Sequence, residues 1–571
     1  MNLTPEERQV GKDNFNTVIG ETRRDFLKKG LAAGVVSGAG LGSMYFGYGA
    51  TVENPVRVGI IGTGDEGSVL IGALNPDYVQ VVAIADIRPF NIHRAFHGDY
   101  SSDNTLAVRP GLMSKYEWKS EDEARKHVKV YSDMYDELLD DPDVEAVIIA
   151  LPLHLHDEAA IKAMRKGKDV LTEKLMAHSV HQCKEMSRVA EETQRYLTTG
   201  HQRHYSVLYD NAVDTIKRGL LGDLHFIRAQ WHRGNLPGHD SWQPPLPPPV
   251  GTDVESGEAA KLYPMVKTLH SWKRKRDTVK GAEKDLWIKR VAQLEKQIDD
   301  QILEAANYGY KEITLPDGTN RSALEELIRW RLWNRTGGGL MAELGSHQLD
   351  AASIFISSQR NDGEKVLPIS VTGVGGRHIF PYDREVDDHV YCLYEFPGKG
   401  YYKDFATGEV ADENKKIVVS YSSINGNGYG GYGETVMGTS GTMIVAQEQD
   451  VMLFPGSSTA TRVTAVKESE TGPTLDTTAS GGPAQAIAEA ATSGPVSRGY
   501  TEEIEHWAWC IRNRDLENNR PRCHPKVALA DAVIALTSNI AMERRERIEF
   551  KKEWFDIHSD ETPEGVAPRK V

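Results

Sequence analysis

Apolar and polar positions alternate in blocks between residues 51 and 203. Short apolar runs typical of buried strands begin at Val56, Val79, Val144, Asp169 and Tyr196. Segments with helical periodicity, such as HDEAAIKAMRKG, lie between them. Because strands that alternate with helices form parallel βαβ units, this region predicts a doubly wound α/β sheet.

A different pattern follows residue 204. An amphipathic helix is predicted for residues 284–306, because apolar side chains recur there near helical spacing. Strand-like runs then dominate, namely ISVTGVGGRHI, DDHVYCLYEF, KKIVVSYSSI and GTMIVAQ. They predict a second α/β domain with a large open, mostly antiparallel sheet.

A glycine-rich turn, GTGDEG, joins the first strand to the first helix. Gly62 permits the tight turn, Gly64 lets a diphosphate approach the backbone, and Gly67 allows the helix to pack closely. Asp86 ends the second strand, nineteen residues past Gly67, where an acid accepts a hydrogen bond from a ribose hydroxyl. This favours NAD over NADP, although Arg88 keeps NADP open. A glycine turn without a ligand is the alternative.

These patterns divide the chain into four parts. We assign residues 1–50 to a signal or anchor segment, 51–203 to a Rossmann domain, 204–550 to a C-terminal α/β domain for substrate binding and oligomerisation, and 551–571 to a tail. Within the C-terminal domain we predict a helical insertion at about 235–330 and a low-complexity loop, rich in Thr, Ser, Ala and Gly, at about 456–494.

The net charge of the chain argues against a nucleic-acid partner. The 571 residues carry a net charge of −15, from 67 Lys+Arg against 82 Asp+Glu. We therefore expect no nucleic-acid partner, because phosphate backbones are bound by clustered cations. The four cysteines are far apart and form no CxxC motif, which argues against a disulfide framework or a zinc ribbon and leaves a single bridge open.

The N-terminus carries TRRDFLKKG at residues 22–30, and an uncharged stretch runs from Gly30 to Ala50. This pattern resembles a twin-arginine (Tat) export signal. It predicts contact with the Tat translocase and a periplasmic or exported protein, anchored to the membrane if the segment is not cleaved. A transmembrane helix is disfavoured by seven glycines in the stretch. A chance arginine pair is the other alternative.

Polar side chains also follow the fourth and fifth strands. Pro152 and His156 come after the fourth strand, and Glu173 and Lys174 end the fifth. Ligands of such sheets bind at the carboxyl ends of the strands, so these residues are expected to face one crevice. A packing role for His156 and a surface position for Lys174 are the alternatives.

The stretch GGGLMAELGSHQLD at residues 337–350 places Glu343, His347 and Asp350 at spacings of four and three. On an α-helix these side chains share one face. An acid four residues before a histidine can fix its tautomer and raise its basicity. Zinc could take one His and two carboxylates, but HExxH is absent, and we predict no metal.

Taken in order, these motifs resemble the glucose–fructose oxidoreductase, inositol dehydrogenase and rhizopine-catabolism (Gfo/Idh/MocA) family. The resemblance covers about residues 56–549 apart from the insertions, and GTSGTM at 438–443 adds to it. It implies hydride transfer between a nicotinamide cofactor and a hydroxyl carbon of a sugar, polyol or glycoside. It also implies an oligomer interface on the open sheet, and hence a homodimer or homotetramer.

The resemblance assigns roles to residues. Lys174 would bind the reacting hydroxyl, His347 would move its proton, and Glu343 would orient His347. The cofactor would meet the residues Pro152, His156 and Glu173 in addition to the glycine turn. Arg203 and Asp350 are further candidates for substrate contact. This chain departs from the family pattern at Leu175, which stands in place of a proline, and at Glu343, which stands in place of an aspartate.

Two other functions remain open at this stage. Some relatives are NAD-dependent glycosidases that oxidise a sugar carbon transiently, eliminate the aglycone and reduce the product again. Such an enzyme keeps its NAD tightly bound, which suits an exported protein that meets no pool of free cofactor. The last alternative is a non-catalytic sugar-binding relative.

Overall fold

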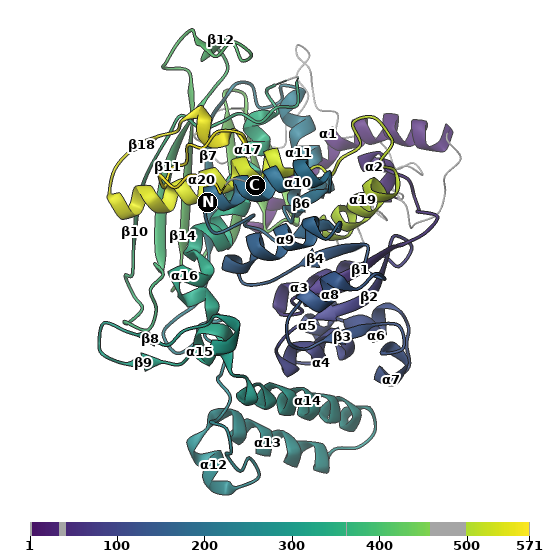
Figure 1. Ribbon diagram of the computed structural model, residues 1–571. Helices are drawn as coiled ribbons and strands as arrows, with labels where there is room; N and C mark the ends of the chain where they lie inside the picture. The colour runs from purple at the N-terminus through teal and green to yellow at the C-terminus, as the bar shows by residue number, and fades with distance from the viewer. Residues whose placement is uncertain (1–2, 33–40, 361, 457–497, 570–571) are drawn as a thin grey trace.

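The computed structural model describes residues 3–32, 41–360, 362–456 and 498–569 (Figure 1). It comprises a parallel-sheet domain, a domain built on a larger mixed sheet, and a helical hairpin that projects beside them. The low-complexity loop predicted at about 456–494 lies outside the described residues except for its first position.

The N-terminal domain contains a six-stranded, fully parallel sheet in the order β3-β2-β1-β4-β5-β6. Its strands are β1 (Val56–Ile61), β2 (Val79–Ala85), β3 (Lys129–Tyr131), β4 (Ala146–Ile149), β5 (Asp169–Thr172) and β6 (Leu197–Thr199). Successive side chains of a strand point to opposite faces. Ile148 and Ile149 accordingly belong to two different apolar cores, one on each face of the sheet.

Helices connect these strands and cover the sheet. They include α3 (Asp65–Ala73), α4 (Pro89–His97), α9 (His156–Arg165) and α10 (Val180–Thr193). The first of them begins directly after the glycine turn, with Gly64 as its N-cap and no side chain capping it. Its first backbone N–H groups are therefore left without a capping side chain, as an anion site at a helix N-terminus requires.

The second domain contains an eight-stranded mixed sheet in the order β17-β16-β15-β7-β14-β11-β10-β18. Its strands are β7 (Leu224–His232), β10 (Ser370–Gly376), β11 (His389–Pro397), β14 (Lys416–Ile424), β15 (Tyr432–Gly438), β16 (Gly441–Ala446), β17 (Asp450–Pro455) and β18 (Ile548–Glu549). The pair β7 and β14 is parallel and the other pairs are antiparallel. The predicted fold class is confirmed by this pair of sheets.

One face of the large sheet is covered by α17 (Ser346–Ser357) and α20 (Pro525–Arg544). Side chains of β11 alternate between this core and the opposite face, where Tyr391 and Leu393 are exposed. Among the described residues, α20 is the one helix long and apolar enough to cross a membrane. Most of that segment, 72%, is buried inside the fold, as expected of a core helix.

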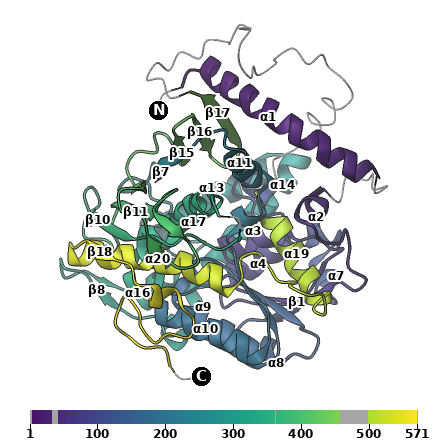
Figure 2. The same cartoon turned by 90° about the horizontal axis from the view of Figure 1, so that it is seen from above.

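The first fifty residues do not form a separate segment where they are described. Helix α1 (Pro5–Ala32) lies along β17 (Figure 2), and Phe15, Val18 and Ile19 are buried there. Asn14 Nδ2 donates to the carbonyl oxygen of Leu453 at 3.0 Å. The twin arginines fall within this helix, and residues 33–40 lie outside the described part. The described first half of α1 thus packs against the large sheet.

The C-terminal part of the chain returns to the N-terminal domain. Helix α19 (Tyr500–Arg512) contributes Ile504 and Trp507 to one core of the parallel-sheet domain. The predicted tail is held by Lys184, whose Nζ donates to the carbonyl oxygens of Glu553, Ser559 and Glu561. Segments from the C-terminal end of the chain thus pack against the N-terminal domain, so each domain in space is not one continuous stretch of the sequence.

The insertion between the large-sheet strands β7 and β10 is helical, as the sequence predicts. It contains α12 (Gly257–Leu262), α13 (Pro264–Thr278), α14 (Ala282–Asp299) and α15 (Ala323–Ile328). Helices α13 and α14 form an antiparallel hairpin, and α14 packs against α4 of the N-terminal domain. The insertion thus contacts both domains.

Candidate active site

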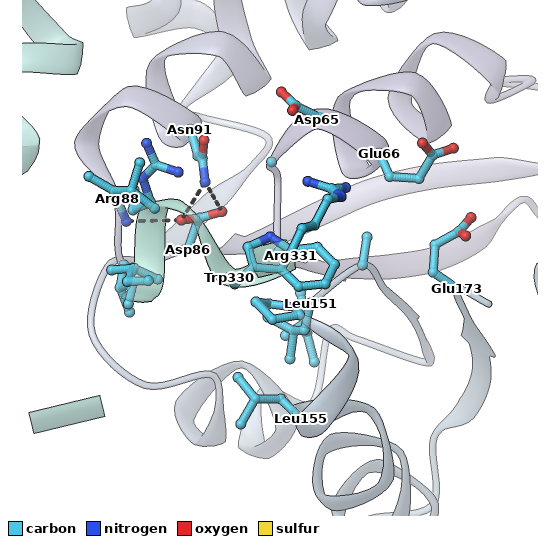
Figure 3. A pocket seen from close by; sticks show the side chains of 18 of the residues that line it. Asp65, Glu66, Asp86, Arg88, Asn91, Leu151, Leu155, Glu173, Trp330 and Arg331 are labelled. Carbon is cyan, nitrogen blue, oxygen red and sulfur yellow. Dashed lines mark hydrogen bonds between the residues drawn. The ribbon is translucent and has the colours of Figure 1, made fainter. Parts of the chain in front are cut away.

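A cavity of about 640 Å³ lies where the two domains and the insertion meet. Its wall on the N-terminal side consists of the glycine turn and the carboxyl ends of β2, β4 and β5. The other wall comes from β7, from the turn before α17, and from the segment around Trp330 and Arg331 (Figure 3). This is the edge of a doubly wound sheet at which ligands bind.

The three glycines of the turn have distinct geometries. Gly62 has φ +87°, and a Cβ there would lie 2.5 Å from the carbonyl oxygen of Ala150. A Cβ on Gly67 would lie 2.2 Å from the carbonyl oxygen of Gly62. At Gly64 the nearest atom would be 3.7 Å away, so its missing side chain leaves open space beside the cavity. Gly62 and Gly64 line the cavity, and Gly67 packs behind them.

Asp86 lines the cavity at the end of β2 and is held by the turn. Its Oδ2 accepts from the backbone N–H of Thr63 at 2.8 Å, and its Oδ1 accepts from the backbone N–H of Arg88 at 2.9 Å. The Arg88 guanidinium is turned to Asp300 of the insertion, with N–O distances of 2.9 and 2.8 Å. Asp86 can therefore accept a hydrogen bond from a ribose hydroxyl, whereas Arg88, which could bind a 2′-phosphate, is paired with Asp300.

Glu173 and Lys174 line the cavity at the end of β5. Burial and the nearby Glu66 carboxylate raise the pKa of Glu173 to about 8, so the carboxyl is largely neutral at pH 7 and able to donate a hydrogen bond. Lys174 Nζ donates to the carbonyl oxygen of Glu343 at 3.0 Å. The lysine therefore reaches across the crevice to the second domain.

His347 lines the same cavity from α17. Its Nδ1 is buried without a hydrogen-bond partner. Burial, followed by the positive charge of Lys174, holds the pKa of His347 well below its usual range, so the imidazole is neutral at pH 7. A neutral imidazole beside an ammonium group is suited to accept a proton from a bound hydroxyl. The Trp231 ring lies 5.8 Å from the His347 ring and adds an aromatic wall.

The predicted contact between Glu343 and His347 is wrong. Glu343 lines the cavity, but its Oε2 accepts from Arg331 Nε at 3.0 Å. Residues Met341–Gly345 form a π-helical turn, which has wider spacing than an α-helix and shifts the register before His347. Burial would raise the pKa of Glu343, but Arg331 and Lys174 lower it below its usual range, so this residue carries a negative charge.

Two predicted substrate contacts do not line the cavity. Asp350 is fully buried, and its Oδ1 accepts from His204 Nε2 at 2.9 Å and from Lys365 Nζ at 3.2 Å. Arg203 is also buried, and its Nε donates to Glu448 at 2.8 Å. Both side chains are paired with internal charges beneath the site.

Of the two predicted cofactor residues after β4, one lines the cavity and the other does not. Pro152 lines the cavity. The His156 side chain is buried behind it, with Nδ1 2.9 Å from the carbonyl oxygen of Leu175 and Nε2 2.9 Å from that of Leu151. Burial lowers the pKa of His156, so one of the two nitrogens donates. The histidine tethers the β4 and β5 loops to each other instead of meeting the cavity.

The buried position of Arg203 makes a specific prediction. Replacement of Arg203 by methionine removes the buried cation beside Glu434 and leaves Arg498 as the cation paired with Glu448, and is expected to lower the free energy of unfolding by about 3–5 kcal/mol. Urea unfolding would measure this loss. Arg165→Met, at an exposed position, serves as the control. A raised KM with unchanged stability would instead return Arg203 to the substrate site.

Sequence reasoning missed the contribution of the segment before the glycine triplet. Arg331 lines the cavity, and its guanidinium points toward the start of α3, which carries Asp65 and Glu66 (Figure 3). It lies 4.3 Å from the centre of the Trp330 ring. No motif marks these two residues, because their position depends on how the insertion folds back. Trp231 and Arg233 lie in the stretch QWHRGN, whose aromatic and basic composition is the one available signal.

The strand order, the glycine turn and the acid at the end of β2 together define a dinucleotide-binding Rossmann domain. Residues 56–201 match the model of the GFO_IDH_MocA family, described as an oxidoreductase family with an NAD-binding Rossmann fold. The N-terminal domain therefore has the fold of a dinucleotide-binding Rossmann domain, and its sequence matches this family over residues 56–201.

Curated relatives match parts of the chain. A glycosyl hydrolase family 109 protein of Solibacter usitatus is 25% identical over 228 residues, which cover 38% of this chain and 46% of the relative. A 1,5-anhydro-D-fructose reductase of Ensifer adhaerens is 35% identical over 104 residues, covering 18% of this chain and 31% of the relative. The chain thus spans about half the length, or less, of these relatives.

A solved structure supports the two-domain architecture. The NAD-binding oxidoreductase from Klebsiella pneumoniae has a TM-score of 0.50 and 16% sequence identity. The likeness covers 87% of this chain and the whole of that structure. At this identity the likeness extends to the fold alone.

Proposed function

We propose that this protein is an NAD-dependent oxidoreductase that transfers a hydride between nicotinamide and a hydroxyl carbon of a sugar, polyol or glycoside. The observation that carries the proposal is the meeting of Lys174 and His347, from two domains, in the cavity that the glycine turn and Asp86 also line. The N-terminal domain supplies the dinucleotide site. The second domain supplies a proton acceptor beside it.

The chain's own residues account for the proton in this reaction. The Lys174 ammonium donates hydrogen bonds, holds the substrate oxygen and stabilises negative charge on it. The neutral His347 imidazole accepts the hydroxyl proton as the carbon–hydrogen bond is broken. NAD, when bound, supplies the hydride acceptor. The Trp231 ring, Glu343 and Arg233 line the cavity and suit a ligand with an apolar face and several hydroxyls.

A second candidate function is a glycosidase that uses bound NAD for transient oxidation. The partial match to a relative named as a glycosyl hydrolase family 109 protein favours it. This mechanism uses the same hydride and proton transfers and returns the cofactor to its starting state. It therefore needs no second substrate to regenerate NAD.

One experiment separates these functions. The purified protein is tested with added NAD⁺ and a panel of free sugars and polyols, following NADH absorbance, and with aryl glycosides without added cofactor, following aglycone release. The proposed dehydrogenase accumulates NADH with at least one free sugar or polyol. Aglycone release without NADH supports the glycosidase. If neither reaction occurs and NAD⁺ does not bind, the oxidoreductase proposal is rejected.

We also propose export through the Tat translocase to the periplasm and assembly into a homo-oligomer. The support for export is the stretch TRRDFLKKG, and the support for assembly is the uncovered face of the large sheet with Tyr391 and Leu393 exposed. Replacement of Arg23 and Arg24 by lysines is expected to keep the protein out of the periplasmic fraction. Periplasmic protein at the unchanged level would contradict the export proposal.

A further inference from the structure

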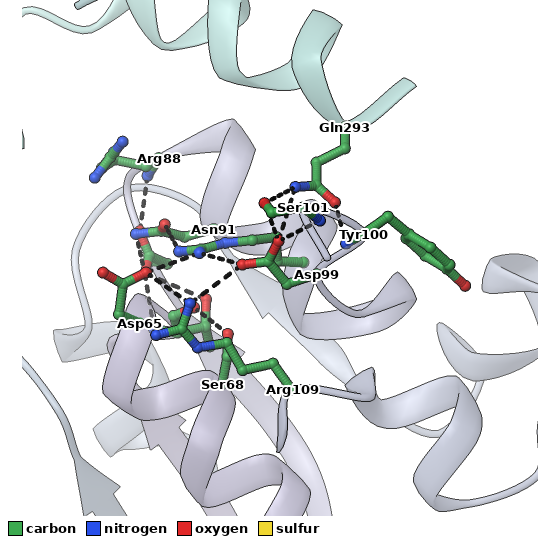
Figure 4. Close-up of polar contacts among 12 residues, drawn as sticks. Asp65, Ser68, Arg88, Asn91, Asp99, Tyr100, Ser101, Arg109 and Gln293 are labelled. Carbon is green, nitrogen blue, oxygen red and sulfur yellow. Dashed lines mark hydrogen bonds and ion pairs between the residues drawn. The ribbon is translucent and has the colours of Figure 1, made fainter. Parts of the chain in front are cut away.

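We infer that the helical insertion closes over the adenosine half of the dinucleotide and holds the cofactor in place between turnovers. The inference rests on the proposed NAD-dependent function. It concerns the contacts of α14 and of the segment that follows it, which no sequence motif marks. Figure 4 shows the contact between Gln293 of α14 and the N-terminal domain.

The first contact is a buried ion pair. The Asp300 side chain is fully buried directly after α14, and its Oδ2 accepts from Arg88 Nε and Nη2. Its Oδ1 accepts from the backbone N–H of Phe90 at 3.1 Å. Arg88 lies two residues past Asp86, at the ribose end of the cavity. The insertion is therefore fastened beside the group that recognises the adenosine ribose.

The second contact is made by Gln293 of α14 with the loop after α4. Its Oε1 accepts from the backbone N–H of Tyr100 at 2.7 Å, and its Nε2 donates to Asp99 Oδ1 at 3.0 Å (Figure 4). Arg290 Nε donates to the carbonyl oxygen of Tyr100 at 2.9 Å. Asp99 is in turn paired with Arg94 at 3.1 Å. A directed, largely buried set of hydrogen bonds thus joins the hairpin to the nucleotide-binding domain.

The same insertion also lines the cavity. Between the start of α14 and the start of α15, the residues that do so are Gln297, Asn307, Tyr308 and Tyr310. Tyr308 Oη donates to Asp133 Oδ1 at 3.0 Å, and the Tyr310 ring lies edge-on to His154 at 5.7 Å. These contacts form a wall over the adenosine end. Both ends of the insertion join the second domain, so the wall cannot swing away without breaking the ion pair or the Gln293 contacts.

A cofactor enclosed in this way leaves more slowly than a cofactor in an open cleft. Removal of one buried hydrogen bond without replacement is expected to speed release of the cofactor by about 5- to 150-fold. Arg88, the basic residue two positions past Asp86, is paired with Asp300 and so is not free to bind a 2′-phosphate. The enclosed site therefore favours NAD over a dinucleotide with a 2′-phosphate.

The test measures nucleotide exchange in the full-length protein. The protein is loaded with isotope-labelled NAD⁺, passed through gel filtration, and chased with unlabelled NAD⁺. The unaltered protein should retain the label, and Asp300→Ala and Gln293→Ala should each release it at least about fivefold faster. Asp299→Ala is the matched control, because this neighbouring acid forms an exposed pair with Lys296 at 2.8 Å.

The outcomes are distinguishable. Equal release rates in the unaltered protein and in Gln293→Ala would overturn the latch and leave the proposed function standing. Failure of the unaltered protein to bind NAD⁺ at all would overturn the proposed function itself. If Asp300→Ala fails to fold, by circular dichroism, Gln293→Ala carries the test. Preferential retention of NADP⁺ over NAD⁺ would contradict the role given to the Arg88–Asp300 pair.

Discussion

Replacement of Lys174 by methionine is expected to lower turnover by about 10²- to 10⁴-fold while the protein still binds NAD⁺. The side chain lines the cavity beside His347, and its Nζ donates a hydrogen bond to the carbonyl oxygen of Glu343. Methionine keeps roughly the length of the side chain and removes its positive charge. The substitution therefore removes the group that holds the substrate oxygen and stabilises it as its proton leaves. Turnover is measured on the substrate that the sugar and glycoside assays identify.

The matched control is Lys166→Met. Lys166 is an exposed lysine of the same domain that pairs with Asp140 at the surface. Its replacement should leave turnover unchanged. Loss of NAD⁺ binding in Lys174→Met would assign the lysine to the cofactor site, and full turnover would remove it from the reaction. His347→Gln should produce a loss of similar size, because it removes the proton acceptor from the same cavity.

Replacement of Gly67 by valine is expected to abolish NAD⁺ binding. The Cβ alone would lie 2.2 Å from the carbonyl oxygen of Gly62, a separation that forces the backbone to move. Gly62 has little freedom to yield, because its own geometry places it against Ala150. Overpacking of this kind costs about 1–3 kcal/mol of folding stability, and the strain is relieved by displacing the turn that would hold the diphosphate.

Gly257→Ala provides the control for this substitution. A Cβ on Gly257 would meet nothing within 4 Å, at the start of α12 in the insertion. Calorimetric titration with NAD⁺ should therefore give the unaltered affinity for Gly257→Ala and no measurable binding for Gly67→Val. Normal NAD⁺ affinity in a folded Gly67→Val protein would contradict the assignment of the glycine turn.

The sequence was sufficient for the features that depend on local pattern. The order of apolar strands predicted the parallel sheet, and the spacing from Gly67 to Asp86 placed an acid at the end of β2, where it lines the cavity. The positions of Lys174 and His347 in that cavity were also anticipated. In each case the residue sits at a strand end or on a helix whose neighbours in the chain decide where it points.

The features that the sequence did not predict depend on contacts between distant segments. Glu343 was expected to face His347 because α-helical spacing was assumed, and a π-helical turn changes that spacing. Arg203 and Asp350 were predicted to contact the ligand because the sequence does not show whether a charged side chain faces a cavity or an internal partner. Glu448, the partner of Arg203, lies 245 residues away in the chain. Arg331 and Asp300 reach the site only because the insertion folds back.

The position of α1 has a consequence for the solubility of the protein. Strand β17 is at the edge of the large sheet, and an uncovered edge strand offers free backbone groups to another chain. Asn14 engages one of these groups, the carbonyl oxygen of Leu453, while Phe15 and Val18 of α1 are buried. Removal of residues 3–19 would expose this edge and is expected to favour aggregation through strand pairing. Helix α1 thus shields the edge of the large sheet from other chains.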